Sequence, residues 1–360
     1  TVGACCLFAI SSNAQEIATP QAIEQAEESI EAFREQAGKE WGFAAAVWAK
    51  GRVVWSEQWG PRDKQKDLPV TPETMFRIGS VSKLITVMTL AAMVEQQQIG
   101  LDTTIDQYLT DLPAPLHKIT PRMLAGHLSG IRHYDPQRMQ QEYLSQASYE
   151  SQREALQVFI GDPLAAEPVQ KYLYSTYGYT VLGAVLESAG RKPLATLMRE
   201  HVFMPAGMQH TFGEHNESVE GELAVPWVNF GGRELPAPPI NNSGKLAGGG
   251  IVSTPVDLAK FLGATAEHRI ASEATLESML ESQAAADGSP TRVGIGWRIA
   301  TDDKARRYIH HGGSAAGGRA FVLIYPDAKA GVAMCMNLSS RQNSFDEKLA
   351  MQVIEPFLQQ

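Results

Sequence analysis

Strand-forming segments lie at both ends of the chain, whereas the long middle is rich in helical patterns. Near the start, two β-prone runs at residues 43–48 and 53–59 are joined by Lys50-Gly51, which predicts a hairpin. Near the end, the β-prone runs are residues 293–299, 308–310, 320–325 and 332–337. A sheet accepts strands that are far apart in sequence. We therefore predict one antiparallel sheet built from both ends of the chain.

Helical segments accompany these strands. Between Pro20 and Gly38 apolar residues recur at helical spacing, which predicts a surface helix, and a closing helix is expected around residues 345–357. The fold class is therefore α/β of the α+β kind: an antiparallel sheet flanked by N- and C-terminal helices, with a mainly helical inserted domain. Residues 20–78 together with 293–360 would form the sheet domain, and residues 79–292 the helical domain. We expect the active site in a cleft at their junction.

The first residues carry the pattern of a secretory signal. Residues 2–10 are apolar and residues 11–15 are small or polar, so that cleavage after Ala14 is expected and residues 1–14 would be a signal-peptide remnant. This predicts a secreted or periplasmic protein. Two alternatives stay open: a lipid anchor on Cys5, and an ordinary apolar N-terminal strand or helical turn.

Composition excludes some partners. With 44% hydrophobic residues in 360, the chain can bury a large core, and its net charge of -9 repels phosphate backbones, so nucleic acid is not expected as a partner. No later stretch is long and apolar enough to cross a membrane. Cys335 stands alone in an apolar run, which is typical of a small buried hydrophobe.

Ser80 and Lys83 lie at the start of an apolar helix. Residues 81–94 are apolar on nearly every side, which predicts a helix inside the core, and residues three apart share a face of its first turn. Burial lowers the pKa of an ammonium and can leave a neutral amine able to take a proton from a hydroxyl. Taken alone, the spacing also fits a Ser80 that caps the helix and a Lys83 that reaches solvent.

Two further clusters carry polar groups beside predicted elements. Four tyrosines in residues 172–179 precede a second apolar helix, and a tyrosine on the loop entering a core helix can direct its hydroxyl into a cleft. Such tyrosines can equally be packing groups. His310 and His311 precede a glycine-rich run, where a substrate backbone can come close. No His-Glu-x-x-His, paired cysteine or acidic triplet completes a metal site, so we expect neither a metal nor a cofactor.

Three motifs, in this order, resemble those of the serine β-lactamase and penicillin-binding protein superfamily: Ser80-Val81-Ser82-Lys83, Tyr174-Ser175-Thr176 and His311-Gly312-Gly313. Residues 119–134 and 248–254 add further landmarks, and the similarity runs from about residue 20 to the end. It is greatest to the class C-like branch, which includes carboxypeptidases, esterases and the mitochondrial β-lactamase-like protease. Residues 131–134 and the Tyr-Ser-Thr form favour the last group.

The resemblance implies a β-lactamase/transpeptidase-like fold and a role for each matching residue. Ser80 would be the acylated nucleophile, Lys83 its base and Tyr174 the relay that protonates the leaving group. The substrate, a small molecule or a peptide, would be bound by Thr176, His311, Gly313 and Ser314. The amide groups of Ser80 and Ser314 would form the oxyanion hole. His127 and His133 are interpreted as histidines that fix loops.

Two departures from the family pattern affect the expected substrate. Thr176 stands where Asn is common, and His311 stands where class C β-lactamases present Lys, so efficient cephalosporin hydrolysis is not expected. We predict a serine hydrolase that acts through an acyl-enzyme on amide or peptide bonds. A promiscuous esterase and a weak β-lactamase are alternatives, and a non-catalytic peptide or peptidoglycan-binding protein is an alternative of another class. The oligomeric state is left open.

Overall fold

The computed structural model describes residues 18–214, 222–340 and 345–358. The expected signal segment, residues 1–14, and the alternative anchor Cys5 lie outside these residues. The helices are α1 (Pro20–Ala37), α2 (Ser82–Glu95), α3 (Pro121–Ala125), α4 (Gln152–Ala155), α5 (Thr176–Gly190), α6 (Leu194–Met198), α7 (Met204–Ala206), α8 (Leu246–Gly249), α9 (Pro255–Ala266), α10 (Glu273–Leu280) and α11 (Glu347–Leu358). The strands are β1 (Phe43–Ala49), β2 (Arg52–Trp59), β3 (Pro61–Asp63), β4 (Leu68–Pro69), β5 (Phe76–Arg77), β6 (Phe212–Gly213), β7 (Trp227–Phe230), β8 (Arg233–Pro236), β9 (Ile251–Ser253), β10 (Arg298–Thr301), β11 (Arg307–Ala315), β12 (Gly318–Tyr325), β13 (Ala330–Met336) and β14 (Leu338–Ser339).

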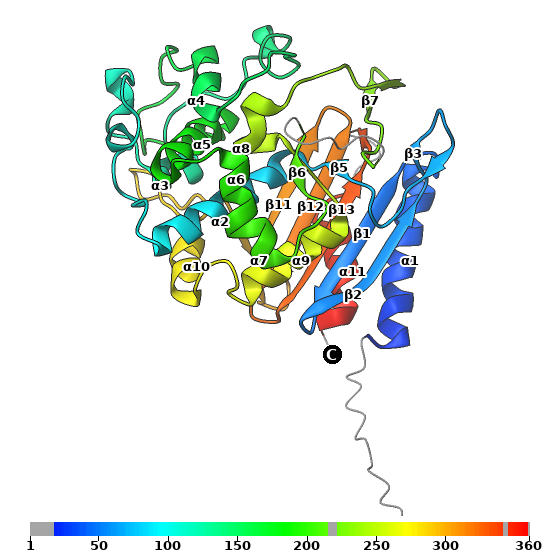
Figure 1. Cartoon of the computed structure of the whole chain (residues 1–360). Coiled ribbons are helices and arrows are strands. Elements are labelled where there is room, and N and C mark those ends of the chain that lie inside the picture. The colour runs from blue at the N-terminus through cyan, green and yellow to red at the C-terminus, as the bar shows by residue number, and fades with distance from the viewer. Residues whose placement is uncertain (1–17, 215–221, 341–344, 359–360) are drawn as a thin grey trace, which may run out of the picture.

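The main sheet has six strands in the order β10-β11-β12-β13-β1-β2 (Figure 1). Every neighbouring pair is antiparallel, and β1 from the start of the chain lies against β13 from its end, with Val47 opposite Val332. The prediction of one antiparallel sheet from both ends is therefore confirmed. The hairpin predicted around Lys50-Gly51 is the β1–β2 connection.

Two predicted strands were wrong in their bounds. The strand expected at residues 308–310 is longer, because β11 continues to Ala315, and the strand expected at residues 293–299 begins later. Residues 293–299 were expected to be extended, but β10 begins only at Arg298. The residues before it form a tight turn, in which the Gly294 amide donates to the Trp297 carbonyl at 2.9 Å and Gly296 has a φ of 80°. Gly296, which as a glycine tolerates a positive φ, thus allows a turn in place of the first half of the expected strand.

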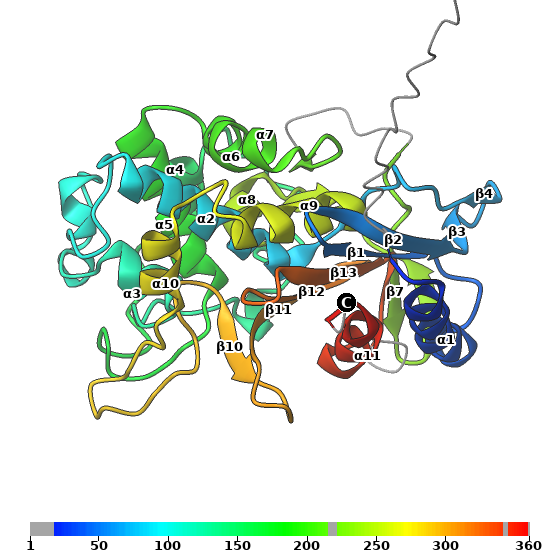
Figure 2. The ribbon, with the colours of Figure 1, turned by 90° about the horizontal axis from the view of Figure 1, so that it is seen from below.

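Helices cover both faces of the sheet (Figure 2). The helices α1 and α11 pack together on one face, and α9 packs against β1 and β13 on the other. The buried side of α1 consists of the predicted apolar positions Ala22, Ala26, Ile30, Phe33 and Ala37. The two chain ends thereby share one core, because α1 and α11 bury their apolar sides between each other and the sheet.

The middle of the chain is mainly helical, and three smaller sheets, β3-β4, β5-β9-β6 and β14-β7-β8, accompany the main sheet. The domain boundaries at residues 78/79 and 292/293 stay predictions, and α9, from within the inserted range, packs on the main sheet.

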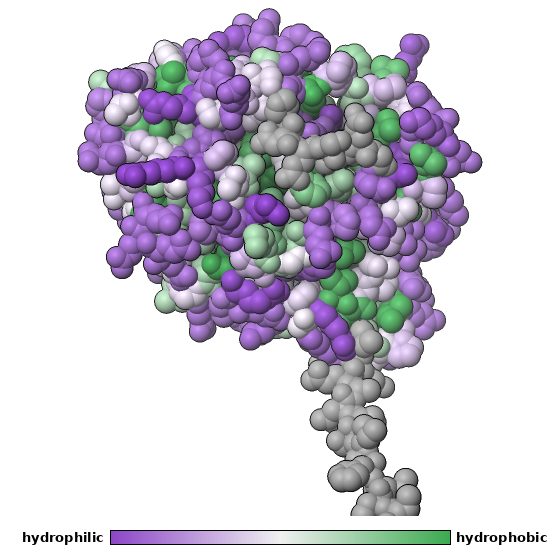
Figure 3. Space-filling model, viewed as in Figure 1, coloured by the Kyte–Doolittle hydropathy of each residue, from purple (hydrophilic) through white to green (hydrophobic). Residues whose placement is uncertain are grey.

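Cys335 is fully buried, as expected. Among the described residues no helix combines the length and apolar character needed to span a membrane. The face seen in Figure 3 is largely hydrophilic, with apolar residues in scattered groups.

Candidate active site

Ser80 lies in a single 3-10 turn, Gly79–Val81, that leads directly into α2. The residues of α2 from Ser82 to Met93 are all buried, so the helix enters the core as its apolar sequence predicted. Lys83, in the first turn of α2, is 0% exposed. The alternative interpretation is therefore wrong: Lys83 does not reach solvent, and the Ser80 side chain makes no capping hydrogen bond. Ser80 itself is half-buried, whereas Lys83 is fully enclosed.

Three oxygen atoms surround the amine of Lys83. Its Nζ lies 3.2 Å from Ser80 Oγ, 3.2 Å from Thr176 Oγ1 and 2.6 Å from the carbonyl oxygen of Gly248. A neutral amine has two N–H groups and one lone pair, which suits two acceptors and one hydroxyl donor. Burial lowers the pKa of Lys83, against the opposing effect of Tyr174. The arrangement therefore favours a lone pair directed at the Ser80 hydroxyl.

Tyr174 approaches the same hydroxyl from the loop before α5. Its OH lies 2.7 Å from Ser80 Oγ, and the Lys83 amine lies 4.9 Å from the centre of its ring. Burial acts to raise the pKa of Tyr174, but the adjacent Lys83 and the hydrogen bonds of the phenol leave that pKa below its ordinary value. The pair thus gives up one proton more readily than lysine and tyrosine do in water. Whichever of the two then lacks the proton is a base beside Ser80.

Two histidines, the buried His127 and the half-buried His133, hold the backbone of the second motif. The Nδ1 atoms of His127 and His133 accept the amide protons of Ser175 and Thr176, both at 3.2 Å. The ring of His127 also lies 4.4 Å from that of Tyr174. Burial and the adjacent Lys83 lower the pKa of both histidines, that of His133 to about 4. Neutral rings can keep an unprotonated nitrogen as acceptor, which agrees with their interpretation as histidines that fix loops.

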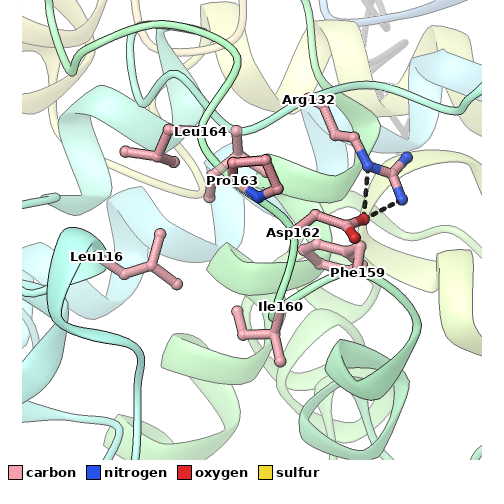
Figure 4. A pocket seen from close by; sticks show the side chains of 8 residues that line it. Leu116, Arg132, Phe159, Ile160, Asp162, Pro163 and Leu164 are labelled. Carbon is pink, nitrogen blue, oxygen red and sulfur yellow. Dashed lines mark hydrogen bonds and ion pairs between the residues drawn. The ribbon is translucent and has the colours of Figure 1, made fainter.

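Arg132 fixes the same loop from its other side. Its carbonyl oxygen accepts the hydroxyl proton of Ser175 at 2.7 Å. Its guanidinium bonds Asp162 at 2.7 Å and Glu142 at 2.8 Å, and Figure 4 shows it facing Asp162 beside a small pocket with apolar side chains. Ser80 does not line this pocket. We interpret the pocket as part of the loop's support, because every charge that it contains is paired.

The third motif lies on β11 and packs against the turn that holds Ser80. Gly313 comes so close that a Cβ atom on it would lie 1.9 Å from the carbonyl oxygen of Ile78, and a Cβ on Gly79 would lie 2.7 Å from the backbone of Ser314. This contact brings the backbones of Ser80 and Ser314 near each other. His311 is buried, and burial together with Lys83 lowers its pKa to about 3, so its ring is neutral at neutral pH.

Six of the seven residues predicted from the sequence meet at the turn that holds Ser80. Ser80, Lys83, Tyr174 and Thr176 are joined by direct hydrogen bonds, and the backbones of Gly313 and Ser314 contact that turn. The seventh, His311, lies on the same strand β11, and Lys83 contributes to the lowering of its pKa. Sequence reasoning did not anticipate the Gly248 carbonyl as a partner of Lys83, although residues 248–254 had been noted as a landmark. A backbone acceptor leaves no side-chain signal. Within the described residues, no group of three or more histidine, cysteine or acidic side chains is placed to hold a metal.

The fold and this cluster define a protein of the serine β-lactamase and penicillin-binding protein type. The profile of the Beta-lactamase family matches residues 26–354, and the chain belongs to that family. The superfamily inferred from the three motifs is thereby confirmed.

Curated relatives and solved structures agree with this assignment. The human serine beta-lactamase-like protein LACTB, mitochondrial, is 29% identical over 307 residues, covering 67% of this chain and 56% of LACTB. The D-aminopeptidase of Gluconobacter oxydans is 26% identical, covering 88% of this chain and 59% of the enzyme. The chain thus spans little more than half the length of these relatives. The crystal structure of the D-amino acid amidase from Ochrobactrum anthropi SV3, complexed with L-phenylalanine amide, superposes with a TM-score of 0.79 at 21% identity, over 93% of this chain and 98% of the amidase.

Proposed function

We propose that this protein is a serine hydrolase that forms an acyl-enzyme on Ser80 and acts on amide, peptide or ester bonds. One observation carries the proposal: a single half-buried hydroxyl lies within hydrogen-bond distance of both a buried amine, Lys83, and a phenol, Tyr174. A hydroxyl is a weak nucleophile until an adjacent base takes its proton. Both candidate bases are held in place by the packing described above.

The acylation step follows from these contacts. Ser80 Oγ attacks the substrate carbonyl carbon, and its proton passes to the Lys83–Tyr174 pair. The carbonyl oxygen becomes an oxyanion, which the amide groups of Ser80 and Ser314 would stabilise. When the bond to the leaving amine or alcohol breaks, Tyr174 returns the proton to it. Water then attacks the ester on Ser80 and releases the acid, which regenerates the hydroxyl.

The remaining predicted residues would bind the substrate. Thr176 offers one hydroxyl, already in contact with Lys83, to a substrate amide, and the strand β11, which carries His311, Gly313 and Ser314, would form the opposite wall of the site. The neutral ring of His311 gives little attraction for a substrate carboxylate. We therefore place amide and peptide bonds first, in keeping with the D-aminopeptidase and D-amino acid amidase among the similar proteins, esters second and β-lactams third.

Covalent labelling tests the proposal. The purified protein is treated with a fluorophosphonate, digested and examined by mass spectrometry, and we expect one adduct on Ser80. The control is Ser80→Ala, which should fold with an unchanged circular dichroism spectrum but bind no label and hydrolyse no p-nitrophenyl ester or peptide. An unlabelled Ser80 in the folded wild type would favour the non-catalytic binding protein instead.

A further inference from the structure

Arg77 occupies a buried position three residues before Ser80. It lies on β5, which pairs with β9, and it is only 8% exposed. Its guanidinium donates hydrogen bonds to two groups. Nε and Nη2 donate to the carboxylate of Glu214 at 2.9 and 2.7 Å, and Nη1 donates to the carbonyl oxygen of Ala316 at 2.6 Å. A planar guanidinium fixes the relative positions of two such partners, which a lysine cannot do.

Ala316 belongs to the turn between β11 and β12, two residues beyond Ser314. The turn is also pressed against β5, because a Cβ atom on Gly318 would lie 2.4 Å from the carbonyl oxygen of Arg77. Gly79 contacts the Ser314 backbone in the same way. The segments 77–80 and 314–318 therefore touch backbone to backbone, and the guanidinium of Arg77 links them a second time.

Glu214 extends the link to the segment whose backbone carbonyl, that of Gly248, accepts a hydrogen bond from Lys83. Its second oxygen accepts a hydrogen bond from the Asn242 side chain at 2.5 Å, and Asn242 precedes the short helical stretch that ends in Gly248 and Gly249. The Gly248 carbonyl is the closest partner of Lys83. One ion pair thus connects the nucleophile turn, the β11–β12 turn and the backbone that carries the acceptor for Lys83.

Stability alone is a weak explanation for such a pair. Moving two charges out of water is unfavourable, and well-packed apolar side chains of similar size are often as stable or more stable. Apolar side chains form no directional hydrogen bonds, so they cannot hold a carbonyl and a carboxylate at fixed angles to one backbone. The geometry therefore suits a part whose task is alignment.

We propose that Arg77 is a positioning residue that holds the amide groups of Ser80 and Ser314 at the spacing of an oxyanion hole, by clamping the β11–β12 turn to β5 through Ala316 and Glu214. The inference rests on the proposed hydrolase function and concerns one part of it, the stabilisation of the tetrahedral intermediate. A shift of about 1 Å in such a site lowers a rate by about a hundredfold.

The test uses Arg77→Lys in the full chain, which keeps a positive charge beside Glu214 but cannot reproduce the fork. Arg306→Lys is the matched control, because the guanidinium of Arg306 likewise joins two acceptors, here the carboxylates of Asp302 and Glu355, but lies just before β11, at the end far from Ser314. Three quantities are measured: kcat and KM for a p-nitrophenyl ester, the inhibition constant of phenylboronic acid, and the acid limb of the pH–rate profile. Phenylboronic acid forms a bond between boron and Ser80 Oγ, and the displaced proton passes to the Lys83–Tyr174 pair, so its adduct copies the tetrahedral state.

For Arg77→Lys we expect kcat to fall about 10–100-fold and KM to change less than threefold. The boronate affinity should fall by about the same factor as kcat. The acid limb should not move, since Lys83 and Tyr174 are untouched, and Arg306→Lys should match the wild type. Glu214→Gln should show the same pattern and serves as the test variant if Arg77→Lys fails to fold.

Equal losses in Arg77→Lys and Arg306→Lys, or a folded Arg77→Lys with unchanged kcat and boronate affinity, would overturn the inference. A wild type that is neither labelled on Ser80 nor bound by the boronate would instead refute the hydrolase function, and this inference with it.

Discussion

The amine of Lys83 lies 2.6 Å from the carbonyl oxygen of Gly248, nearer than to either hydroxyl that it contacts. A carbonyl accepts a hydrogen bond but carries no full charge, so it orients the amine without stabilising the ammonium form as a carboxylate would. The charged groups that act most strongly on the pKa of Lys83 are Tyr174 and Arg298 rather than any aspartate or glutamate. The site therefore keeps its lysine ready to accept a proton.

Replacing this amine should separate activity from stability. In Lys83→Met we expect kcat/KM to fall about 10²–10⁴-fold, because the proposed base is lost. The free energy of unfolding should rise by about 1 kcal/mol, because an apolar chain of similar length fits a fully buried position better than an amine does. Ester hydrolysis and urea denaturation measure the two effects. A near-normal rate would assign the role of base to Tyr174, and a large loss of stability would mean that the Lys83 hydrogen bonds are structural.

Stability should depend on pH through the half-buried His133 and the buried His311. Burial lowers the pKa of His133 to about 4 and that of His311 to about 3 in the folded state, whereas histidine in an unfolded chain titrates near 6.5. Between these values the unfolded chain binds more protons than the folded one, so the free energy of unfolding decreases as the pH falls below about 6.5 and is fully retained above it. Urea denaturation at several pH values from 7.5 to 5, above the range where most carboxylates titrate, measures this slope.

The matched variants for this slope are His133→Asn and His117→Asn. The first removes a titrating group but keeps an oxygen that can accept the Thr176 amide proton, so the slope should become shallower. The second alters an exposed histidine and should leave the slope as it is. A wild type whose stability is flat from pH 7.5 to 5 would contradict the prediction.

Two adjacent glycines on β11, Gly312 and Gly313, differ in the room that each leaves for an added methyl group. A Cβ on Gly313 would lie 1.9 Å from the Ile78 carbonyl, whereas a Cβ on Gly312 would meet nothing nearer than the Phe321 ring at 3.4 Å. Gly313→Ala should push β11 away from the Ser80 turn and lower kcat by about 10²-fold, and Gly312→Ala should have little effect. Ester kinetics on both variants, with circular dichroism to verify folding, measure this difference. Equal behaviour of the two would show that the contact with Ile78 does not set the site.

The sheet was predicted from local patterns, whereas the cluster around Ser80 was predicted because three motifs, in order, resemble those of a known superfamily. The β-prone runs of the main sheet, the all-round apolar α2 and the buried side of α1 are each visible in a short window. The bounds of β10 were missed because Gly294 and Gly296 turn the chain where its apolar residues suggested a strand. Arg77, Glu214 and the Gly248 carbonyl were missed because their partners lie more than a hundred residues away in the sequence. Contacts of that kind depend on how the segments pack, which periodicity alone does not encode.

The hydrogen bond from the Ser175 amide to His127 can be tested with a variant that keeps an acceptor for this amide but lacks the imidazole ring. His127 has a φ of 59°, a left-handed conformation that asparagine tolerates and β-branched or bulky apolar residues do not, and its Nδ1 accepts the Ser175 amide proton. In His127→Asn the amide oxygen can take the place of Nδ1, so we expect kcat within about fivefold of the wild type. In His127→Leu the buried amide proton loses its acceptor, which is expected to lower the free energy of unfolding by about 1–3 kcal/mol and to displace Tyr174, with a clear fall in kcat. Denaturation and ester kinetics distinguish the two variants. If both lose activity alike, the ring contact with Tyr174 at 4.4 Å, rather than the hydrogen bond to Ser175, is what His127 contributes.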